Sequence, residues 1–207
     1  MYFLILQSDG KLFFHEHLIG MSTINFTANL IRRTEVMKRQ ENDEFKPVKV
    51  SIVELDKDSE DDVKALYKTS ILWLDQGAKY SSNIYHEAVK GYEYDDIEKE
   101  HYFALTEQNE GFNKLDSEKI LGLMLFSNTR HDTDQICWFQ VRPNTNTTDS
   151  WQREYKGVGK SMMDLIKVIN YNKPIYVQSS DKAVEFYKKQ GFIVDDKNTP
   201  SCLTLYV

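Results

Sequence analysis

Residues 180–192 read SDKAVEFYKKQGF, and this stretch contains the signals that mark both ends of a helix. Ser180 or Asp181 can cap the start, because a short polar side chain accepts a hydrogen bond from an N–H group of the first turn. Gly191 suits the position directly after a helix, where the backbone often turns left-handed. The stretch therefore predicts a short helix, and the apolar residues around it predict a strand on either side.

Residues 154–161 read EYKGVGKS and lie between a predicted strand that closes at Pro143 and a predicted helix. Apolar residues on one face indicate this helix; they are Val158, Met162, Leu165, Ile166 and Ile169. A helix N-terminus presents unpaired N–H groups, and glycines such as Gly157 and Gly159 let a ligand approach the backbone. These features suit a pyrophosphate, although a plain structural turn explains the glycines equally well on this signal alone.

Gly159-Lys160-Ser161 also resembles the end of a Walker A motif. That motif requires a further glycine five residues before the first of these three, and the chain has Glu154 there. The loop should also follow its strand immediately, yet about a dozen residues intervene. Hydrolysis of a nucleoside triphosphate is therefore disfavoured.

Taken together, the two stretches resemble the GNAT N-acetyltransferases. The last helix of that family has a small polar residue, an alanine, an aromatic–tyrosine pair and a final Gly-Phe; here these are Ser180, Ala183, Phe186-Tyr187 and Gly191-Phe192. Val141-Arg142-Pro143 resembles the strand end before the family's cofactor loop, and residues 154–159 resemble the loop itself. The resemblance covers residues 48–207, and the first 47 residues match nothing in it.

The resemblance implies that acetyl-CoA is the cosubstrate and that its pantetheine arm enters between two parallel strands that splay apart, at 135–142 and 174–178. It implies a role in cofactor binding for Phe139, Gln140, Val141, Tyr155, Lys156, Gly157, Val158, Gly159, Lys160, Ser161, Ser180 and Phe186. It also implies that Tyr187 protonates the leaving thiolate. The chain departs from the family in having Glu154 where the loop usually opens with Arg or Gln, and in a long insertion at 144–153.

The remaining pattern predicts an α+β fold with a mixed central sheet of about six or seven strands and four helices, which the resemblance makes GNAT-like. The predicted strands are 48–55, 102–106, 120–126, 135–142, 174–178, 193–194 and 203–207, and the other two helices are 58–75 and 84–100. Residues 48–207 form the expected acetyltransferase domain. Residues 1–47 form an N-terminal extension, with a hairpin at 2–17 and a segment at 22–41 that suits either a helix or a strand.

Composition excludes some classes of function. The chain has 207 residues and a formal net charge of −6, so general binding to nucleic acid or to an anionic membrane is disfavoured and cationic acceptors are mildly favoured. The longest apolar run, at 120–126, is too short to span a membrane. Cys137 and Cys202 are interpreted as reduced thiols, and a cytoplasmic location is expected.

Three local clusters allow both a plain and a functional interpretation. His15 and His17 share a predicted strand face, but no further metal ligand is evident nearby, so no metal is expected. Two acidic clusters, at 56–62 and 93–100, are solvated helix faces or a rim that attracts a cationic amine. Aromatic residues among them provide core packing or a wall for an acceptor; they are Trp73, Tyr80, Tyr85, Tyr92 and Tyr94.

The favoured function is an N-acetyltransferase that moves the acetyl group from acetyl-CoA to a primary amine, on a small molecule or a peptide, by direct attack in a ternary complex. The alternative is an acyl-CoA-binding protein without catalysis, which the absence of an acidic residue on the strand 135–142 favours. A third hypothesis is a partner-binding module in which residues 1–47 mediate either dimerisation, as a homodimer, or toxin–antitoxin pairing. The acceptor amine and the general base cannot be identified from the sequence.

Overall fold

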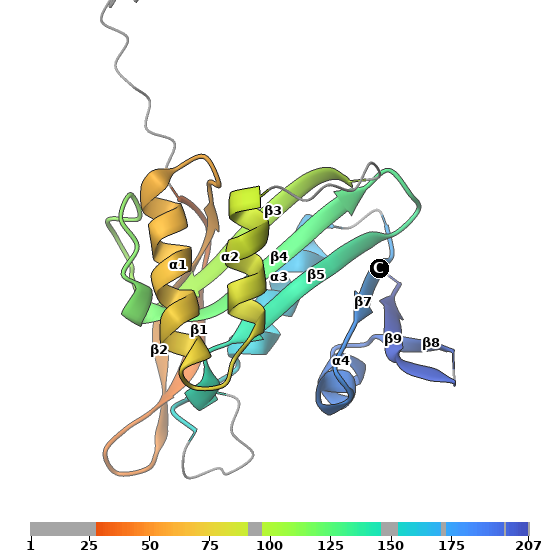
Figure 1. The fold of residues 1–207 in the computed structure, drawn as a ribbon. Coiled ribbons are helices and arrows are strands. Elements are labelled where there is room, and N and C mark those ends of the chain that lie inside the picture. The colour runs from red at the N-terminus through yellow and green to blue at the C-terminus, as the bar shows by residue number, and fades with distance from the viewer. Residues whose placement is uncertain (1–27, 91–96, 146–152, 171–172, 197, 207) are drawn as a thin grey trace, which may run out of the picture.

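The computed structural model describes residues 28–90, 97–145, 153–170, 173–196 and 198–206. The hairpin expected at 2–17, including His15 and His17, lies outside these residues. In the described chain, a single sheet of nine strands runs through the molecule in the order β6-β1-β2-β3-β4-β5-β7-β9-β8 (Figure 1).

The strands are β1 (Asn29–Arg39), β2 (Phe45–Leu55), β3 (Ile97–Thr106), β4 (Ile120–Thr129), β5 (Asp134–Val141), β6 (Tyr155–Lys156), β7 (Ile175–Gln178), β8 (Ile193–Asp196) and β9 (Thr199–Leu205). All neighbours pair antiparallel except β5 and β7, which are parallel. The mixed sheet expected from the sequence is confirmed, with nine strands in place of six or seven. The two additional strands are β1 and β6, at one edge.

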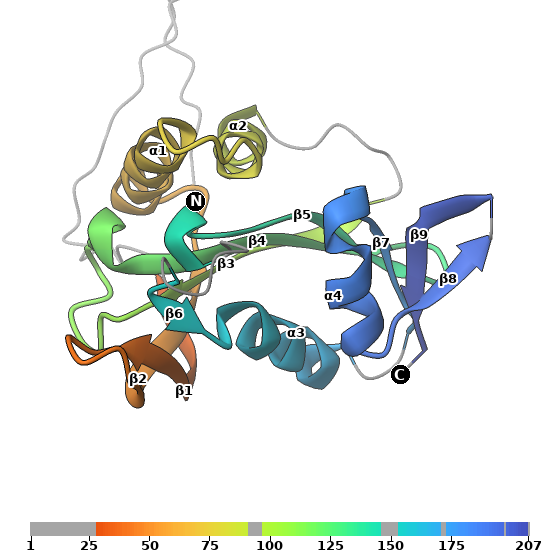
Figure 2. The ribbon, with the colours of Figure 1, turned by 90° about the horizontal axis from the view of Figure 1, so that it is seen from below.

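Four helices cover the sheet, as expected: α1 (Glu60–Leu74), α2 (Tyr80–Lys90), α3 (Val158–Ile169) and α4 (Val184–Lys189). Single 3-10 turns are η1 (Ser117–Lys119), η2 (Pro143–Thr145) and η3 (Asp181–Ala183). Helices α1 and α2 lie on one face of the sheet, and α3 and α4 lie on the other (Figure 2). No helix in the described residues is long and apolar enough to cross a membrane.

The two faces of the sheet form two separate apolar cores. Strand β4 lies in the middle of the sheet, and nine of its ten residues are buried, which confirms the prediction of a central strand. Side chains that alternate along it point to the two cores: Met124 and Phe126 lie in the core with α3, whereas Leu123 and Leu125 lie in the core with α1 and α2. On α3 the expected apolar stripe is buried except for Ile169, which is 38% exposed at the end of the helix.

Two expectations about local structure were wrong. The helix predicted at 84–100 ends at Lys90, and residues from Ile97 onward belong to β3, where they pair with β4 from Thr129 to Phe126. Pairing with a central strand outweighs the helix preference of the glutamates and lysines there. The boundary expected at residue 47 falls inside β2, and β1 pairs along most of that strand. In the described chain, residues 29–47 are therefore part of the sheet.

Asp62 is a buried carboxylate in the first turn of α1. Its Oδ2 accepts a hydrogen bond from the N–H of Asp56 at 2.9 Å, but its Oδ1 has no hydrogen-bond partner among the described residues. Burial raises the pKa of Asp62 from 3.8 to about 6. Because this folded-state pKa lies above the unfolded value, the group lowers stability as pH rises through the interval from about 4 to 6.

We predict that Asp62→Asn raises the free energy of unfolding at pH 7.5 by about 1 kcal/mol, because the amide keeps an oxygen for Asp56 and removes a poorly solvated charge. Urea titrations at pH 4 and pH 7.5 measure the effect, which should be much smaller at pH 4. The exposed neighbour Asp61→Asn is the matched control and should change little. A variant less stable than the natural chain at pH 7.5 would show that the charge of Asp62 is stabilising.

Candidate functional site

The parallel strands β5 and β7 stay together for only a short distance. Three residue pairs connect them, from Asp134 with Ile175 to Ile136 with Val177. The pairing of β5 with β4 shifts register at Cys137, as in a β-bulge, and β5 then continues to Val141 without a strand on its other side. A bulge bends its strand and increases the local twist. The expected splay between these two strands is therefore present, and it begins at the bulge.

The exposed edge of β5 presents main-chain groups to this gap. The N–H of Arg142 donates to the carbonyl of Leu121 at 2.9 Å, so residue 142 bonds toward β4. In an antiparallel pair, alternate residues direct their N–H and C=O groups to opposite sides. Residue 140 thus also bonds toward β4, whereas the main-chain groups of Phe139 and Val141 point into the gap. The N–H of Phe139 is available to a bound molecule there.

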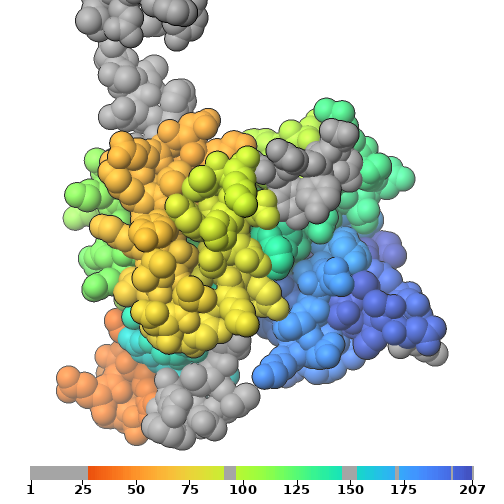
Figure 3. Space-filling model, viewed as in Figure 1, coloured from red at the N-terminus to blue at the C-terminus, as the bar shows by residue number. Residues whose placement is uncertain are grey.

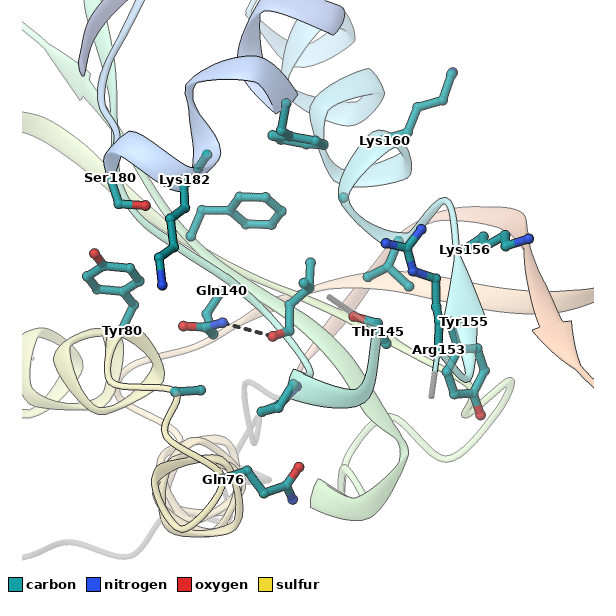
Figure 4. Close-up of a pocket in the computed structure, with 18 of the residues that line it drawn as sticks. Gln76, Tyr80, Gln140, Thr145, Arg153, Tyr155, Lys156, Lys160, Ser180 and Lys182 are labelled. Carbon is teal, nitrogen blue, oxygen red and sulfur yellow. Dashed lines mark hydrogen bonds between the residues drawn. The ribbon is translucent and has the colours of Figure 1, made fainter. Parts of the chain in front are cut away.

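A cavity of about 650 Å³ occupies the gap and extends to the N-terminus of α3 (Figure 4). Its lining contains all of the predicted cofactor residues except Ser161; these are Phe139, Gln140, Val141, Tyr155, Lys156, Gly157, Val158, Gly159, Lys160, Ser180 and Phe186. Tyr187 also lines it. Ser161 instead lies in the first turn of α3, where its N–H donates to the carbonyl of Gly157 at 2.9 Å. In the space-filling view a notch separates the blue C-terminal elements from the rest of the molecule (Figure 3).

The N-terminus of α3 has the features of an anion site. Gly157 adopts φ 90°, a left-handed conformation that suits glycine, and turns the chain from β6 into the helix. Hydrogen bonding within the helix begins with Ser161, so the N–H groups of Val158, Gly159 and Lys160 precede the first intrahelical bond. These groups and the positive end of the helix dipole face the cavity that these residues line.

Gly159 is constrained by the aromatic wall of the cavity. A Cβ atom at this position would lie 3.0 Å from two ring atoms of Phe186, too close for the present ring position. The centre of the Phe186 ring lies 6.1 Å from the centre of the Phe139 ring. It lies 5.1 Å from the centre of the Tyr187 ring, which it meets edge-on. A side chain at residue 159 would therefore displace this aromatic group before it crowded a bound phosphate.

The charge of the cavity lining is uniformly positive. Five cations line it, Lys79, Arg153, Lys156, Lys160 and Lys182, and no described aspartate or glutamate does. This contrasts with the formal net charge of −6 of the whole chain. Lys160 forms an ion pair with Asp164, one turn further along α3, and the Lys156 ammonium lies 3.6 Å from the centre of the Phe45 ring. The cavity therefore favours an anionic ligand.

Glu154, which departs from the family pattern, does not oppose such a ligand. Its Oε2 accepts a hydrogen bond from Nδ2 of Asn144, and its main chain bonds to Asn144 and Arg39. Glu154 is not part of the cavity lining. The insertion at 144–153 thus supplies the partner that holds this carboxylate, although residues 146–152 of it lie outside the described chain.

The acidic rim considered from the sequence is not at this site. Asp56, Asp58 and Glu60 lie at the N-terminal end of α1, whereas the cavity is lined by residues 76–80, beyond its C-terminal end. Of the second cluster, Glu93, Asp95 and Asp96 lie outside the described residues, as do Tyr92 and Tyr94. None of the described members of the two acidic clusters lines the cavity.

The aromatic residues divide between the two roles. Trp73 is buried in the core under α1 and α2, and the ring of Tyr85 packs at a tilt against that of Tyr67 outside the cavity. Tyr80 alone of the described members lines the cavity, where its ring stacks on Trp138 at 5.7 Å.

Tyr187 combines a packed ring with a position at the cavity. The residue is 5% exposed, and its ring packs edge-on against Phe186 and Phe192. Burial raises the pKa of the Tyr187 hydroxyl far above its ordinary value of 10. The hydroxyl therefore stays protonated throughout the physiological range, as a proton donor must.

Tyr155 has mainly a structural role. Its ring is 1% exposed and points away from the other labelled cavity residues (Figure 4). The Lys38 ammonium lies 5.2 Å from the centre of the Tyr155 ring and also pairs with Glu107 at 3.0 Å, and burial raises the pKa of Tyr155 to about 12. This contact attaches β6 to the edge strand β1 and so fixes the chain that leads into α3.

Several cavity residues were not predicted from the sequence. The segment 76–80 between α1 and α2, and the residues Pro143, Thr145, Arg153, Lys182 and Ala183, complete the lining. Segment 76–80 carries no motif, and the fold brings it to β5 from sixty residues away. Arg153 and Lys182 were detectable in principle, because each lies beside a residue of the two informative stretches.

Neither a metal site nor a disulfide is found in the described residues. No group of three or more His, Cys, Asp or Glu side chains there is placed to hold a metal ion. Cys137 on β5 and Cys202 on β9 form no disulfide within the described residues. Their sulfur atoms lie 3.2 Å from the hydroxyls of Ser127 and Tyr176, respectively.

Comparison with known proteins gives only structural likenesses. No protein-family model matches the sequence, and no curated protein sequence matches it. An acetyltransferase of Bacillus subtilis in complex with CoA is similar to the chain with 20% identity and a TM-score of 0.40, covering 70% of this chain and 77% of that one.

Two further solved structures are similar at about the same level. A putative N-acetyltransferase from Lactobacillus plantarum has 11% identity and a TM-score of 0.42, covering 75% of this chain and 94% of that one. Tetrahymena GCN5 has 12% identity and a TM-score of 0.42, covering 72% and 90%. At these values the argument for a function rests on the geometry of the site.

Proposed function

We propose that the protein is a GNAT-type N-acetyltransferase that moves the acetyl group of acetyl-CoA to a primary amine by direct attack in a ternary complex. The observation that carries this proposal is one cavity that joins the N-terminus of α3, with its cations Arg153, Lys156 and Lys160, to the free edge of β5 and to Tyr187. A coenzyme A thioester has an anionic pyrophosphate that suits the N-terminus of α3, and a reactive thioester that suits the edge of β5 and Tyr187.

The residues present suit coenzyme A. The pyrophosphate would lie on the N–H groups of Val158, Gly159 and Lys160, with the charges of Arg153 and Lys156 nearby. The pantetheine arm would run along the free edge of β5, where Phe139 and Val141 present main-chain groups. Phe186 and the ring of Phe139 would form the apolar wall of its channel. Acetyl-CoA would supply a thioester, whose acetyl carbon is open to attack by a nitrogen.

The N–H of Phe139 would act on the acetyl oxygen, and the hydroxyl of Tyr187 would act on the sulfur of the thioester. Transfer forms a bond between the amine nitrogen and the acetyl carbon and breaks the carbon–sulfur bond. The N–H of Phe139 would stabilise negative charge on the acetyl oxygen. The Tyr187 hydroxyl would donate the proton that the sulfur gains, the nitrogen would release its own proton to solvent, and Tyr187 would regain a proton from solvent.

Direct attack is favoured because the cavity lining lacks the parts of a covalent mechanism. Among the described lining residues there is no Cys, His, Asp or Glu, so neither a thiol nucleophile nor an imidazole or carboxylate base for Ser180 is placed there. The same lining offers the amine no carboxylate or imidazole base, so the amine would lose its proton to solvent before it attacks. It also keeps the rival function, acyl-CoA binding without catalysis, as the second candidate.

We predict that acetyl-CoA stabilises the folded chain, by about 2.7 kcal/mol at a hundredfold excess over Kd. A thermal-shift series with acetyl-CoA, ATP and NAD measures this effect and compares three phosphate-bearing cofactors. A release of free thiol when amines are added would then show that the protein is an enzyme and not only an acyl-CoA-binding protein. A shift with ATP and none with acetyl-CoA would rule out the proposed cosubstrate.

We also predict that Tyr187→Phe lowers kcat about 100-fold while the affinity for acetyl-CoA stays nearly unchanged, because the variant keeps the ring and loses only the proton donor. The natural enzyme should not lose activity through Tyr187 up to about pH 10, since burial holds its hydroxyl protonated. Thiol release measured from pH 6 to pH 10 in both proteins is the test. Equal rates in the two proteins over that range would assign the proton to water or another group.

A further inference from the structure

The two ends of the cavity lie on opposite faces of the sheet. Phe139 and Val141 pack toward α3 and α4, whereas Trp138 packs toward α1 and α2. Side chains alternate along a strand, so Gln140 lies on the same face as Trp138. The segment 76–80 closes this second end, next to Gln140 (Figure 4). If α3 binds the coenzyme, the acceptor enters from the face of α1 and α2.

This second end has a charge of its own. Lys182 extends from η3 toward Tyr80 and Gln140, away from the cations at the start of α3 (Figure 4). Lys79 belongs to the segment 76–80 and also lines the cavity. Neither lysine forms an ion pair within the part of the chain that the structure describes, in contrast to Lys160, which is paired with Asp164. Two positive charges at this end are therefore available to a ligand.

Gln140 supplies a complementary group. Its Nε2 donates to the carbonyl of Val141 at 2.9 Å, and that oxygen can only accept, so the orientation of the amide is fixed. The Oε1 of Gln140 consequently points the other way, toward Tyr80 and Lys182 (Figure 4). An amide oxygen accepts hydrogen bonds from an amine. This end of the cavity thus combines one acceptor for an N–H group with two cations.

From this arrangement we infer that the acceptor is an amine that carries its own anionic group, a carboxylate or a phosphate, beside the reacting nitrogen. The inference rests on the proposed acetyl transfer. Lys182 and Lys79 bind the anion, and Gln140 Oε1 accepts from the amine. This replaces the expectation of a cationic acceptor, because a polyamine would meet two like charges here.

The same lysines assist the reaction in a cavity without a base. A nearby positive charge lowers the pKa of an ammonium group, since it disfavours the charged form. An acceptor held beside Lys182 and Lys79 therefore loses its proton to solvent more readily and attacks as the neutral amine. The positive charges of Lys182 and Lys79 would therefore both bind the anion and favour the neutral form of the amine.

The test is thiol release from acetyl-CoA with matched acceptor pairs: standard amino acids beside their carboxamides, and phosphoethanolamine beside ethanolamine, with spermidine as the polycation. Rates are expressed as kcat/KM per neutral amine, so that differences in solution pKa cancel. We expect at least a 10-fold preference for the anionic member of one of the pairs. The pair that shows this preference identifies the anion as a carboxylate or a phosphate.

Lys182→Gln should lower kcat/KM for the anionic acceptor about 10-fold, mainly through KM, with little change for its uncharged partner or in KM for acetyl-CoA. Lys188→Gln is the matched control, because Lys188 lies on α4, pairs with Glu185 and does not line the cavity. It should leave all values unchanged. Lys182→Glu should reverse the order and favour the cationic amine.

The outcomes separate the two proposals. Equal or faster turnover of uncharged or cationic amines by the natural enzyme would overturn the anionic acceptor and leave acetyl transfer standing. An equal effect of Lys182→Gln on both members of a pair would do the same. No binding of acetyl-CoA, or binding without turnover of any amine, would overturn acetyl transfer and this inference with it.

Discussion

The site depends on the early end of one parallel strand pairing. Strands β5 and β7 are joined by three residue pairs, and the bulge at Cys137 then turns β5 away. An unpaired strand edge leaves N–H and C=O groups that must bond to water or to a bound molecule. We propose that acetyl-CoA takes this place along the edge of β5. The nine-stranded sheet and the helices on both faces hold the two strands rigidly on either side of that opening (Figure 2).

The cations around the cavity form two groups, one at each end of the opening. An acidic chain places five cations and no described carboxylate around one cavity. Those near the start of α3 add to the free N–H groups of its first turn, which suits a pyrophosphate. Those near Tyr80 lie on the other face of the sheet, where the acceptor would enter. In the proposed acetyl transfer, the described lining residues include no carboxylate or histidine, so the protonation of the acceptor would depend on these charges.

Much of this arrangement follows from local patterns in the sequence. The glycines at 157 and 191, the apolar stripe of α3 and the continuous apolar run of β4 each predict their element. Of the twelve residues predicted to bind the cofactor, all but Ser161 line the cavity. What could not be predicted depends on contacts distant in sequence. Strand β6 has two residues, too few to show a periodic pattern. Residues 97–100 favour a helix but pair with β4. Lys79 reaches the cavity only through the packing of α1 and α2.

Amide hydrogen exchange on the edge of β5 tests the central claim most directly. The N–H groups of Phe139 and Val141 face the gap, whereas the N–H of Gln140 faces β4, so the three residues form an internal comparison. Saturating acetyl-CoA should slow exchange at Phe139 or Val141, and at the first turn of α3, while Gln140 changes little. Unchanged exchange at both residues in a chain shown to bind acetyl-CoA would place the thioester elsewhere and contradict the account.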